Sequence, residues 1–379
     1  MNKKAISIGF VVLLFSATAA NLLVPQREFS ENENRYLQTL PALNGEDLLS
    51  GKFSQSFEKY TADQFLARDG WIGLKTVAEL GMLKKDNQRV YFGKDGVLFD
   101  AGETIDDKQL AENTEAIAAF ARALREREPS LNASTLLIPT ASAVLTKQLP
   151  AFAPVPDQNT ALERAASLLA ADAPLCDVTE LLQNNVDTPL YYRTDHHWTT
   201  QAAYLVYAEW AKSAGLSPLP TAAFSAETVS DSFYGTLYSK ANLPTLKPDS
   251  VTAYVPARPV EVRVDYGEGT ISPSLYREEF LNQKDKYSYF LGGNHAKVEI
   301  ETGTKNGRTL LLLQDSYAHC FVPFLVSHYE RILVLDPRYV KDDIFAYAVE
   351  NHVTDLLTLY NLPNFATDRN VPNILPAEK

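Results

Sequence analysis

Residues 309–319 read TLLLLQDSYAH. Four consecutive leucines before a polar turn predict a short strand, Thr309 to Leu313, that is buried on both faces. A helix is expected to follow, from Ala318 to Ser327. Because ligands of open α/β sheets bind at the carboxyl ends of the strands, Ser316 would lie where a nucleophile acts. The N-terminus of the expected helix would then stabilise an oxyanion beside it.

Strands and helices alternate on both sides of this run. Strands are predicted at 134–138, 174–178, 331–335 and 355–360, and helices at 106–127, 159–171, 199–214 and 341–350. This alternation indicates an α/β fold with a mostly parallel sheet and helices on both faces. The pattern is preceded by a predicted hairpin from Val90 to Phe99 around Lys-Asp-Gly. Residues 216–305 are richer in Pro, Gly, Tyr and β-prone runs, which predicts a β-rich insertion.

The first 88 residues differ from the rest of the chain. Lys3 and Lys4 precede an apolar run from Ala5 to Val24, which predicts a signal peptide or an N-terminal membrane anchor over residues 1–24. Positive charge before the run would keep the N-terminus cytoplasmic and send the remainder outward. Residues 25–88 are predicted to form a helical stem, and residues 89–379 the α/β domain.

Composition limits the classes of function. The 379 residues are 45% hydrophobic and 22% charged, as in folded globular proteins. A net charge of −12 argues against nucleic acid as a partner and weakly against a strongly anionic glycan. Two cysteines, Cys176 and Cys320, are too few for a disulfide scaffold or a zinc cluster, but one bridge or two buried thiols both remain open.

A second motif, RTDHHWTT at 193–200, places two adjacent histidines beside an acid. Asp195 and His197 are two residues apart, so the carboxylate can fix the tautomer of the imidazole and stabilise its charged form. Thr199 or Thr200 is expected to cap the next helix. Trp198 would either shield the pair from water or form a wall on which a sugar stacks.

Together the two motifs supply the parts of a Ser-His-Asp triad. Ser316 is predicted to be the nucleophile, His197 the base and Asp195 the acid that orients it. Taken alone, a serine before a helix is often only a cap, and a histidine pair is often structural. A metal site formed by Asp195, His196, His197 and His319 is the alternative, but adjacent histidines do not readily face one ion, so neither a metal nor a cofactor is predicted.

Further residues are expected near the substrate or the oxyanion. Thr140 and Asn361 follow predicted strands and would reach the same edge of the sheet. The full set of these secondary candidates is Asp315, Tyr317, His196, Trp198, Thr140 and Asn361.

The residues resemble a known family. Asp195-His196-His197-Trp198 is similar to the signature of the DHHW proteins, which are related to the alginate O-acetylation proteins with an SGNH hydrolase-like domain. Asp315-Ser316 at the strand end is the second specific similarity, and Glu33-Asn34-Arg35, Gly93-Lys94-Asp95-Gly96 and Tyr234-Gly235-Thr236 support it, from about residue 30 onward. The resemblance implies an SGNH hydrolase-like, flavodoxin-like sheet. It also implies the roles already predicted for Ser316, His197 and Asp195.

The implied activity is acetyl transfer to a cell-surface or secreted polysaccharide, outside the cytoplasm, with a membrane-bound O-acyltransferase as the partner on the donor side. Gln314 departs from the family pattern, because SGNH enzymes usually have Gly before Asp-Ser. Transfer and hydrolysis of the acetyl group both remain open at this point. So do two rivals, a non-catalytic glycan-binding or scaffold protein and a metal-dependent hydrolase.

Overall fold

The computed structural model describes residues 3–30, 35–267 and 269–376. Glu33 and Asn34, quoted above for the family resemblance, lie outside these ranges. The chain forms two compact units. The first comprises Met1–Asn87 with Tyr238–Leu246, and the second comprises Gln88–Leu237 with Lys247–Lys379.

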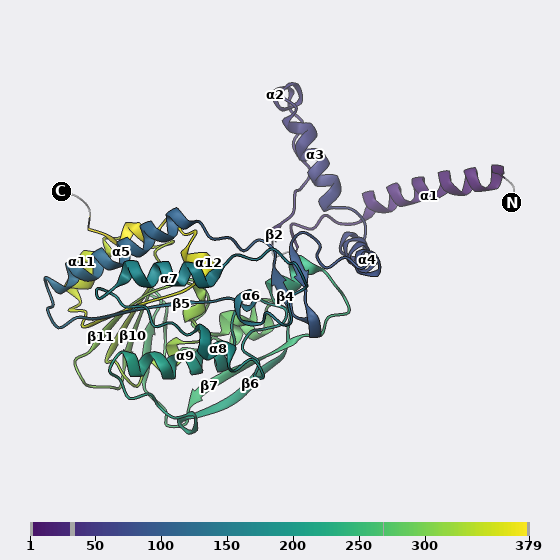
Figure 1. Cartoon of the computed structure of the whole chain (residues 1–379). Coiled ribbons are helices and arrows are strands. Elements are labelled where there is room, and N and C mark those ends of the chain that lie inside the picture. The colour runs from purple at the N-terminus through teal and green to yellow at the C-terminus, as the bar shows by residue number, and fades with distance from the viewer. Residues whose placement is uncertain (1–2, 31–34, 268, 377–379) are drawn as a thin grey trace. The chain divides into compact units, whose positions relative to one another are not determined.

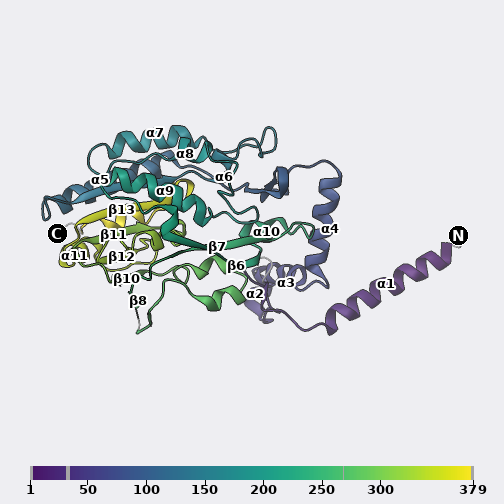
Figure 2. The same cartoon turned by 90° about the horizontal axis from the view of Figure 1, so that it is seen from below.

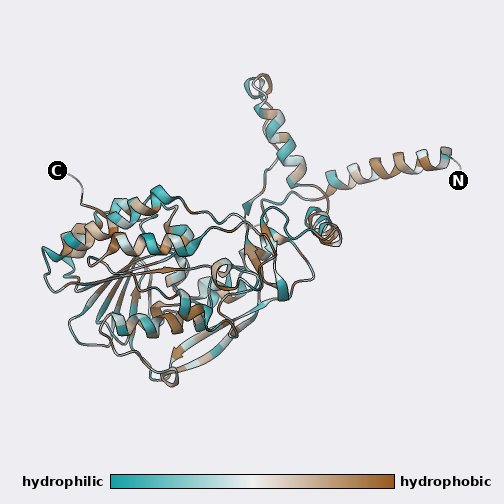
Figure 3. Cartoon of the chain, viewed as in Figure 1, coloured by the Kyte–Doolittle hydropathy of each residue, from teal (hydrophilic) through white to brown (hydrophobic). Residues whose placement is uncertain are grey.

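The first unit is mainly helical. Its elements are α1 (Lys3–Leu23), β1 (Phe29–Ser30), β2 (Arg35–Tyr36), α2 (Gly45–Leu49), α3 (Lys52–Asp63) and α4 (Arg68–Gly81). Arg35 at the start of β2 pairs with the buried carboxylate of Asp63 at 2.6 Å. Apolar residues run along α1 (Figure 3). Within the described ranges, no helix combines the length and the apolar character needed to cross a membrane.

The second unit is built on a seven-stranded sheet in the order β5-β13-β11-β12-β10-β8-β9. In that order the strands are Asn132–Ile138, Asp355–Asn361, Thr309–Gln314, Arg331–Leu335, Lys297–Thr302, Val262–Asp265 and Ile271–Ser272. The first four are parallel, and the last three continue the sheet with antiparallel pairings. Five of the seven strands therefore point the same way. The predicted mixed α/β architecture with a mostly parallel sheet is confirmed.

The leucine run of β11 supplies both faces of the core. Leu310 and Leu312 pack on the side of α9 (Thr200–Ser213), whereas Leu311 and Leu313 face the opposite way. The helices on that opposite side are α5 (Asp107–Arg125), α7 (Gln158–Leu169), α11 (Ile344–Glu350) and α12 (Leu362–Phe365). Figures 1 and 2 show the sheet between these layers. Helices thus cover both faces, as predicted, and each buried leucine contributes about 1.5–3 kcal/mol.

The predicted β-rich insertion divides into two parts. β6 (Phe224–Phe233) and β7 (Asp249–Pro256) form a separate two-stranded sheet, whereas β8, β9 and β10 belong to the main sheet. The hairpin predicted at 90–99 is present as β3 (Val90–Phe92) and β4 (Leu98–Asp100). The remaining helical elements are α6 (Ala141–Val144), α8 (Thr179–Gln183), α10 (Thr236–Ala241), η1 (Lys94–Gly96), η2 (Thr221–Ala223), η3 (Glu278–Asn282), η4 (Lys286–Tyr289), η5 (Ser316–Ala318), η6 (Val322–Phe324) and η7 (Val371–Ile374).

Two predicted elements are wrong. Residues 174–178 form no strand, only a single parallel bridge between Leu175 and Thr135. Residues 318–327 form no α-helix but the short 3-10 turns η5 and η6. Pro323 explains the second error, because it has no N–H to donate and its ring would clash with the carbonyl four residues earlier in a helix.

The two cysteines are free thiols. Cys320 is fully buried, and burial raises the pKa of its thiol to about 12. Cys176 is only partly buried. The sequence left open a disulfide bridge or two buried thiols, and in the structure both thiols are unpaired.

Candidate active site

The DHHW loop is closed by backbone contacts on both sides. Tyr191 and Trp198 form an antiparallel bridge, and the N–H of Thr199 donates to the carbonyl of Leu190 at 2.8 Å. The Thr199 side chain then accepts the N–H of Ala202 and caps α9. These contacts hold Asp195, His196 and His197 in a short loop just before α9.

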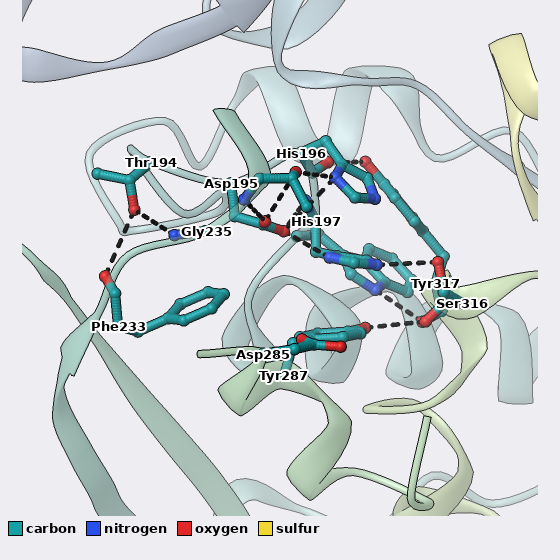
Figure 4. Close-up of polar contacts among 12 residues, drawn as sticks. Thr194, Asp195, His196, His197, Phe233, Gly235, Asp285, Tyr287, Ser316 and Tyr317 are labelled. Carbon is teal, nitrogen blue, oxygen red and sulfur yellow. Dashed lines mark hydrogen bonds and ion pairs between the residues drawn. The ribbon is translucent and has the colours of Figure 1, made fainter. Parts of the chain in front are cut away.

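Three of the predicted residues meet in hydrogen-bond contact (Figure 4). Nε2 of His197 lies 2.8 Å from Oγ of Ser316, and Nδ1 of His197 lies 2.5 Å from Oδ1 of Asp195. The arrangement suits the tautomer in which Nδ1–H donates to the carboxylate and Nε2 accepts from the serine hydroxyl. Residues 119 positions apart in the chain are therefore joined as a hydroxyl–imidazole–carboxylate series.

Asp195 is held by four hydrogen bonds. Its Oδ1 also accepts the backbone N–H of His197 at 3.0 Å, and its Oδ2 accepts the N–H and hydroxyl of Thr236 at 2.7 and 3.0 Å. Burial alone would raise the pKa of Asp195. The nearby rings of His196 and His197 and these hydrogen bonds outweigh burial and hold the pKa well below its ordinary range. Asp195 is thus an oriented carboxylate.

Gly235 leaves room for that carboxylate. A Cβ on this residue would lie 2.2 Å from Cβ and 2.3 Å from Oδ2 of Asp195, a separation that real Cβ atoms do not tolerate. Gly235 and Thr236 belong to the Tyr-Gly-Thr motif noted in the sequence without a role. The structure gives them one, since both lie against Asp195.

Ser316 lies one residue beyond β11, after Asp315, and opens the 3-10 turn η5. The α-helix whose N-terminus was expected to stabilise an oxyanion is not formed, and the short turn η5 stands in its place. Asp315 orders this turn. It accepts the N–H of Tyr317 at 2.9 Å, the N–H of Asn361 at 3.1 Å and Nδ2 of Asn364 at 2.8 Å. Burial raises the pKa of Asp315, against the lowering effect of these bonds.

A polar pocket of about 310 Å³ opens beside Ser316. It is lined by Asp100, Gly102, Glu103, Thr104, Thr140, His196, Asp315, Ser316, Arg338, Asn361, Pro363, Asn364 and Thr367. Five of the predicted residues are in this set. Arg338 and Glu103 were not predicted, and no motif in the sequence marks them.

The secondary candidates in the pocket differ in what their side chains can offer. The hydroxyl of Thr140 is buried and bonds to Glu103 and Gln158. His196 bonds through Nδ1 to the hydroxyl of Thr236 at 2.7 Å and stays one-third exposed. Asn361 accepts the N–H of Asn364 through Oδ1. His196 and Asn361 are therefore better placed than Thr140 to meet a ligand.

Trp198 and Tyr317, which the sequence placed among the candidates near the substrate or the oxyanion, do not line the pocket. Both are fully buried and stack on each other, with ring centroids 5.4 Å apart. The indole N–H of Trp198 donates to the carbonyl of Tyr317, and the phenol of Tyr317 donates to the carbonyl of His196. A sugar cannot reach Trp198, so the two rings instead join the DHHW loop to the segment that carries Ser316.

The geometry gives little support to the alternative of a metal site. Asp195, His196 and His197 do lie close enough to form a ligand group. However, Nδ1 of His197 is bonded to Asp195 and Nδ1 of His196 to Thr236. His319 is not part of the group; it is fully buried, and burial lowers its pKa to about 3. Ligand atoms that satisfy one another are not arranged around an ion.

Three solved structures are similar to this chain. A DHHW family protein from Eubacterium siraeum has a TM-score of 0.58 and 26% identity, over 68% of this chain and 87% of that one. PatB1 of Bacillus cereus, solved with a sulfonyl adduct, gives 0.63 and 20%, over 75% and 98% of the two chains, and so shares the fold. The O-acetyltransferase domain of Pseudomonas putida AlgJ gives 0.46 and 15%, over 74% and 92% of the two chains. No curated protein sequence matches.

A family model for DHHW proteins matches residues 133–335, a span that contains Asp195, His197 and Ser316. This span is more than half of the 379 residues. The chain therefore belongs to the DHHW family.

Proposed function

We propose that this protein is an O-acetyltransferase or acetylesterase that acts on a cell-surface or secreted polysaccharide through an acetyl-serine intermediate. The observation that carries the proposal is the hydrogen-bonded series from Ser316 through His197 to Asp195, beside a polar pocket. This arrangement of hydroxyl, imidazole and carboxylate serves acyl transfer on unrelated folds, so geometry rather than ancestry supports it.

The chemistry follows from the contacts. Ser316 Oγ attacks the acetyl carbonyl while Nε2 of His197 takes the hydroxyl proton, and Asp195 stabilises the imidazolium that forms. When the tetrahedral intermediate collapses, His197 returns the proton to the leaving oxygen and the acetyl group stays on Ser316. A sugar hydroxyl or water then attacks the acetyl-serine, giving its proton to His197, and the serine is regenerated.

Asn361 is proposed to stabilise the oxyanion. Its Oδ1 is fixed by the N–H of Asn364, and its side chain lines the pocket together with Ser316. The amide nitrogen is therefore held in a set orientation and is available to donate. The amide of Asn364, by contrast, is already bonded to Asp315 at 2.8 Å. A side-chain amide beside the nucleophile supplies the kind of donor that a developing negative charge requires.

The setting of the reaction is proposed from the N-terminal segment. The basic residues and apolar run at 3–24 support export, with the catalytic unit outside the cytoplasm and retained by this segment. A membrane-bound O-acyltransferase would then supply the acetyl group on the outer side. Protease accessibility of the second unit in intact cells tests the location. Co-purification of an O-acyltransferase with wild type, lost when residues 1–24 are replaced, tests the partnership.

The catalytic proposal is tested with the full-length protein and an acetyl-ester reporter. Ser316→Ala is compared with wild type, and Ser225→Ala, at an exposed position on β6, serves as the matched control. We expect hydrolysis by wild type and the control, none by Ser316→Ala, and an acetylated Ser316 peptide in mass spectrometry. Acetylation of an added oligosaccharide, at the expense of hydrolysis, would assign the transferase activity.

Equal rates for wild type and Ser316→Ala would contradict the proposal. Retained binding of a glycan with no turnover would instead favour the non-catalytic scaffold. Activity that survives Ser316→Ala and is lost with a chelator would favour the metal-dependent hydrolase.

A further inference from the structure

Tyr287 contacts both the base and the nucleophile, although it lies outside both motifs. It belongs to η4 in the insertion and is almost fully buried. Its ring stacks on the ring of His197, with centroids 3.8 Å apart and planes inclined by only 13°. Its hydroxyl donates to the backbone carbonyl of Ser316 at 3.1 Å (Figure 4). One side chain thus joins the two reacting residues.

The imidazole of His197 lies between two rings. Tyr287 covers one face, and His196 lies at a centroid distance of 3.9 Å and an inclination of 37°. The two hydrogen bonds of His197 hold its two ring nitrogens. The rings stacked on its faces limit rotation of the imidazole about the line through those nitrogens. Since the imidazole becomes cationic during turnover, the electron-rich face of Tyr287 also favours the charged form.

Tyr287 is itself held in place. Its ring meets Tyr192 edge-on at 6.3 Å and Phe290 at 5.6 Å. The turn that carries it is closed by the hydroxyl of Ser288, which donates to Asp285 at 2.6 Å. Because these contacts restrict the movement of the Tyr287 side chain, it can hold His197 and Ser316 in place.

Proton transfer by Tyr287 is not the role that these contacts support. Burial raises the pKa of its phenol far above the ordinary value, so the hydroxyl stays protonated and remains a donor. The ring does not line the pocket beside Ser316.

We infer that Tyr287 is a positioning residue that sets the plane of the His197 ring and the backbone of Ser316 relative to each other. The effect that this inference predicts on kcat rests on the proposed acyl-transfer function. The effect that it predicts on the position of the His197 ring does not depend on turnover. It also means that the insertion contributes to the catalytic geometry as well as to the sheet.

The test uses two substitutions in the full-length protein. Tyr287→Phe keeps the stacked ring and removes the hydroxyl, and Tyr287→Leu removes both. Tyr289→Phe and Tyr289→Leu are the matched controls, because Tyr289 is in the same turn and also buried but stacks on Tyr276 instead. Two readouts are measured: kcat and KM on the acetyl-ester reporter, and the proton resonance of the His197–Asp195 hydrogen bond in protein labelled with ¹⁵N-histidine.

Tyr287→Phe loses the hydrogen bond to the Ser316 carbonyl and the weaker 3.4 Å contact with Sγ of Cys320, and is expected to lower kcat about 5-fold, with the downfield resonance preserved. Tyr287→Leu is expected to lower kcat roughly 100-fold, with KM little changed and the resonance broadened or absent. The Tyr289 variants should match wild type in both readouts. Thermal unfolding identifies any variant that does not fold, and Tyr287→Phe keeps the test valid if Tyr287→Leu is one of these.

A sharp His197 resonance and wild-type kcat in folded Tyr287→Leu would overturn the inference. If wild type itself has no activity on the reporter, the proposed function fails, and the resonance alone decides the role of Tyr287. Equal kinetic losses in the Tyr287 and Tyr289 variants would also overturn the inference, because they would indicate a general effect on the turn.

Discussion

Replacing Gly235 with alanine tests whether the catalytic geometry depends on space beside Asp195. The added methyl would lie 2.2 Å from Cβ, 2.3 Å from Oδ2 and 2.6 Å from Cγ of Asp195, whereas real Cβ atoms do not come within 3.0 Å of other heavy atoms. The backbone of Gly235 does not have a positive φ, so alanine meets no conformational penalty there. Only the collision with Asp195 has to be relieved.

A shift of Asp195 relieves this collision at the lowest cost in free energy. This shift weakens its two bonds to Thr236 and its 2.5 Å bond to His197. Overpacking of this kind costs about 1–3 kcal/mol of folding stability, which corresponds to a fall in Tm of roughly 2–10 °C. Activity should suffer more, with kcat/KM lower by about 10²- to 10⁴-fold, because a misplaced acid no longer fixes the tautomer of the base.

The assay measures kcat/KM on the acetyl-ester reporter together with Tm. Gly303→Ala is the control, because its Cβ would have only an ordinary contact of 3.6 Å, with Glu261. Since Gly235→Ala acts through Asp195, adding it to Asp195→Gly, which removes the Cβ and the carboxylate that the new methyl would meet, should cost little more than Asp195→Gly alone. Wild-type kcat/KM in Gly235→Ala, or losses that simply multiply in the double variant, would refute the reasoning.

Three further predictions concern other parts of the chain. Asn361→Ser keeps an oxygen that caps α12 but removes the amide donor, so kcat should fall about 10²- to 10³-fold at nearly unchanged Tm; unchanged kcat would exclude Asn361 as the oxyanion donor. A chelator should leave ester hydrolysis unaltered, because the Asp195–His197 ligand atoms bond to one another; inhibition reversed by added metal would contradict this. In the first unit, the hydrogen bond from Arg35 lowers the pKa of Asp63 to about 2. Because this pKa lies below that of the unfolded chain, the stabilisation is present at neutral pH and lost as pH falls through about 4 to 2. Asp63→Asn should therefore lower Tm at neutral pH and approach wild type in acid, and a constant difference in Tm across that range would argue against the ion pair.

The central sheet was predictable because its signals are local. Four leucines in β11 have to be buried on both faces, and alternating strand and helix segments on either side leave few arrangements other than a mostly parallel sheet. The same rule placed Ser316 and Asn361 at the carboxyl edge, where the structure finds both beside one pocket. The spacing of Asp195 and His197 predicted their hydrogen bond, since two residues are enough for a carboxylate to reach the imidazole.

Other features depend on contacts that no local pattern encodes. The helix expected after Ser316 fails at Pro323, where the absence of one N–H outweighs the helical composition around it. For Trp198 the sequence left open a shield against water or a wall for a sugar, and in the structure it is the buried ring on which Tyr317 packs. Tyr287 stands in a stretch with no periodicity or motif, and its role appears only when the insertion folds back onto His197.

The insertion therefore determines how the DHHW motif works. Gly235 and Thr236 set the position of Asp195 from one side, and Tyr287 sets the plane of His197 from the other. The four-residue signature alone fixes neither. It follows that a chain with an intact signature and serine, but with a bulky residue at the position of Gly235 or an aliphatic one at that of Tyr287, would hold the same three groups in a less productive geometry. Substitutions at Gly235, Thr236 and Tyr287 should thus change kcat as strongly as many substitutions in the signature itself, although only the signature is apparent in the sequence.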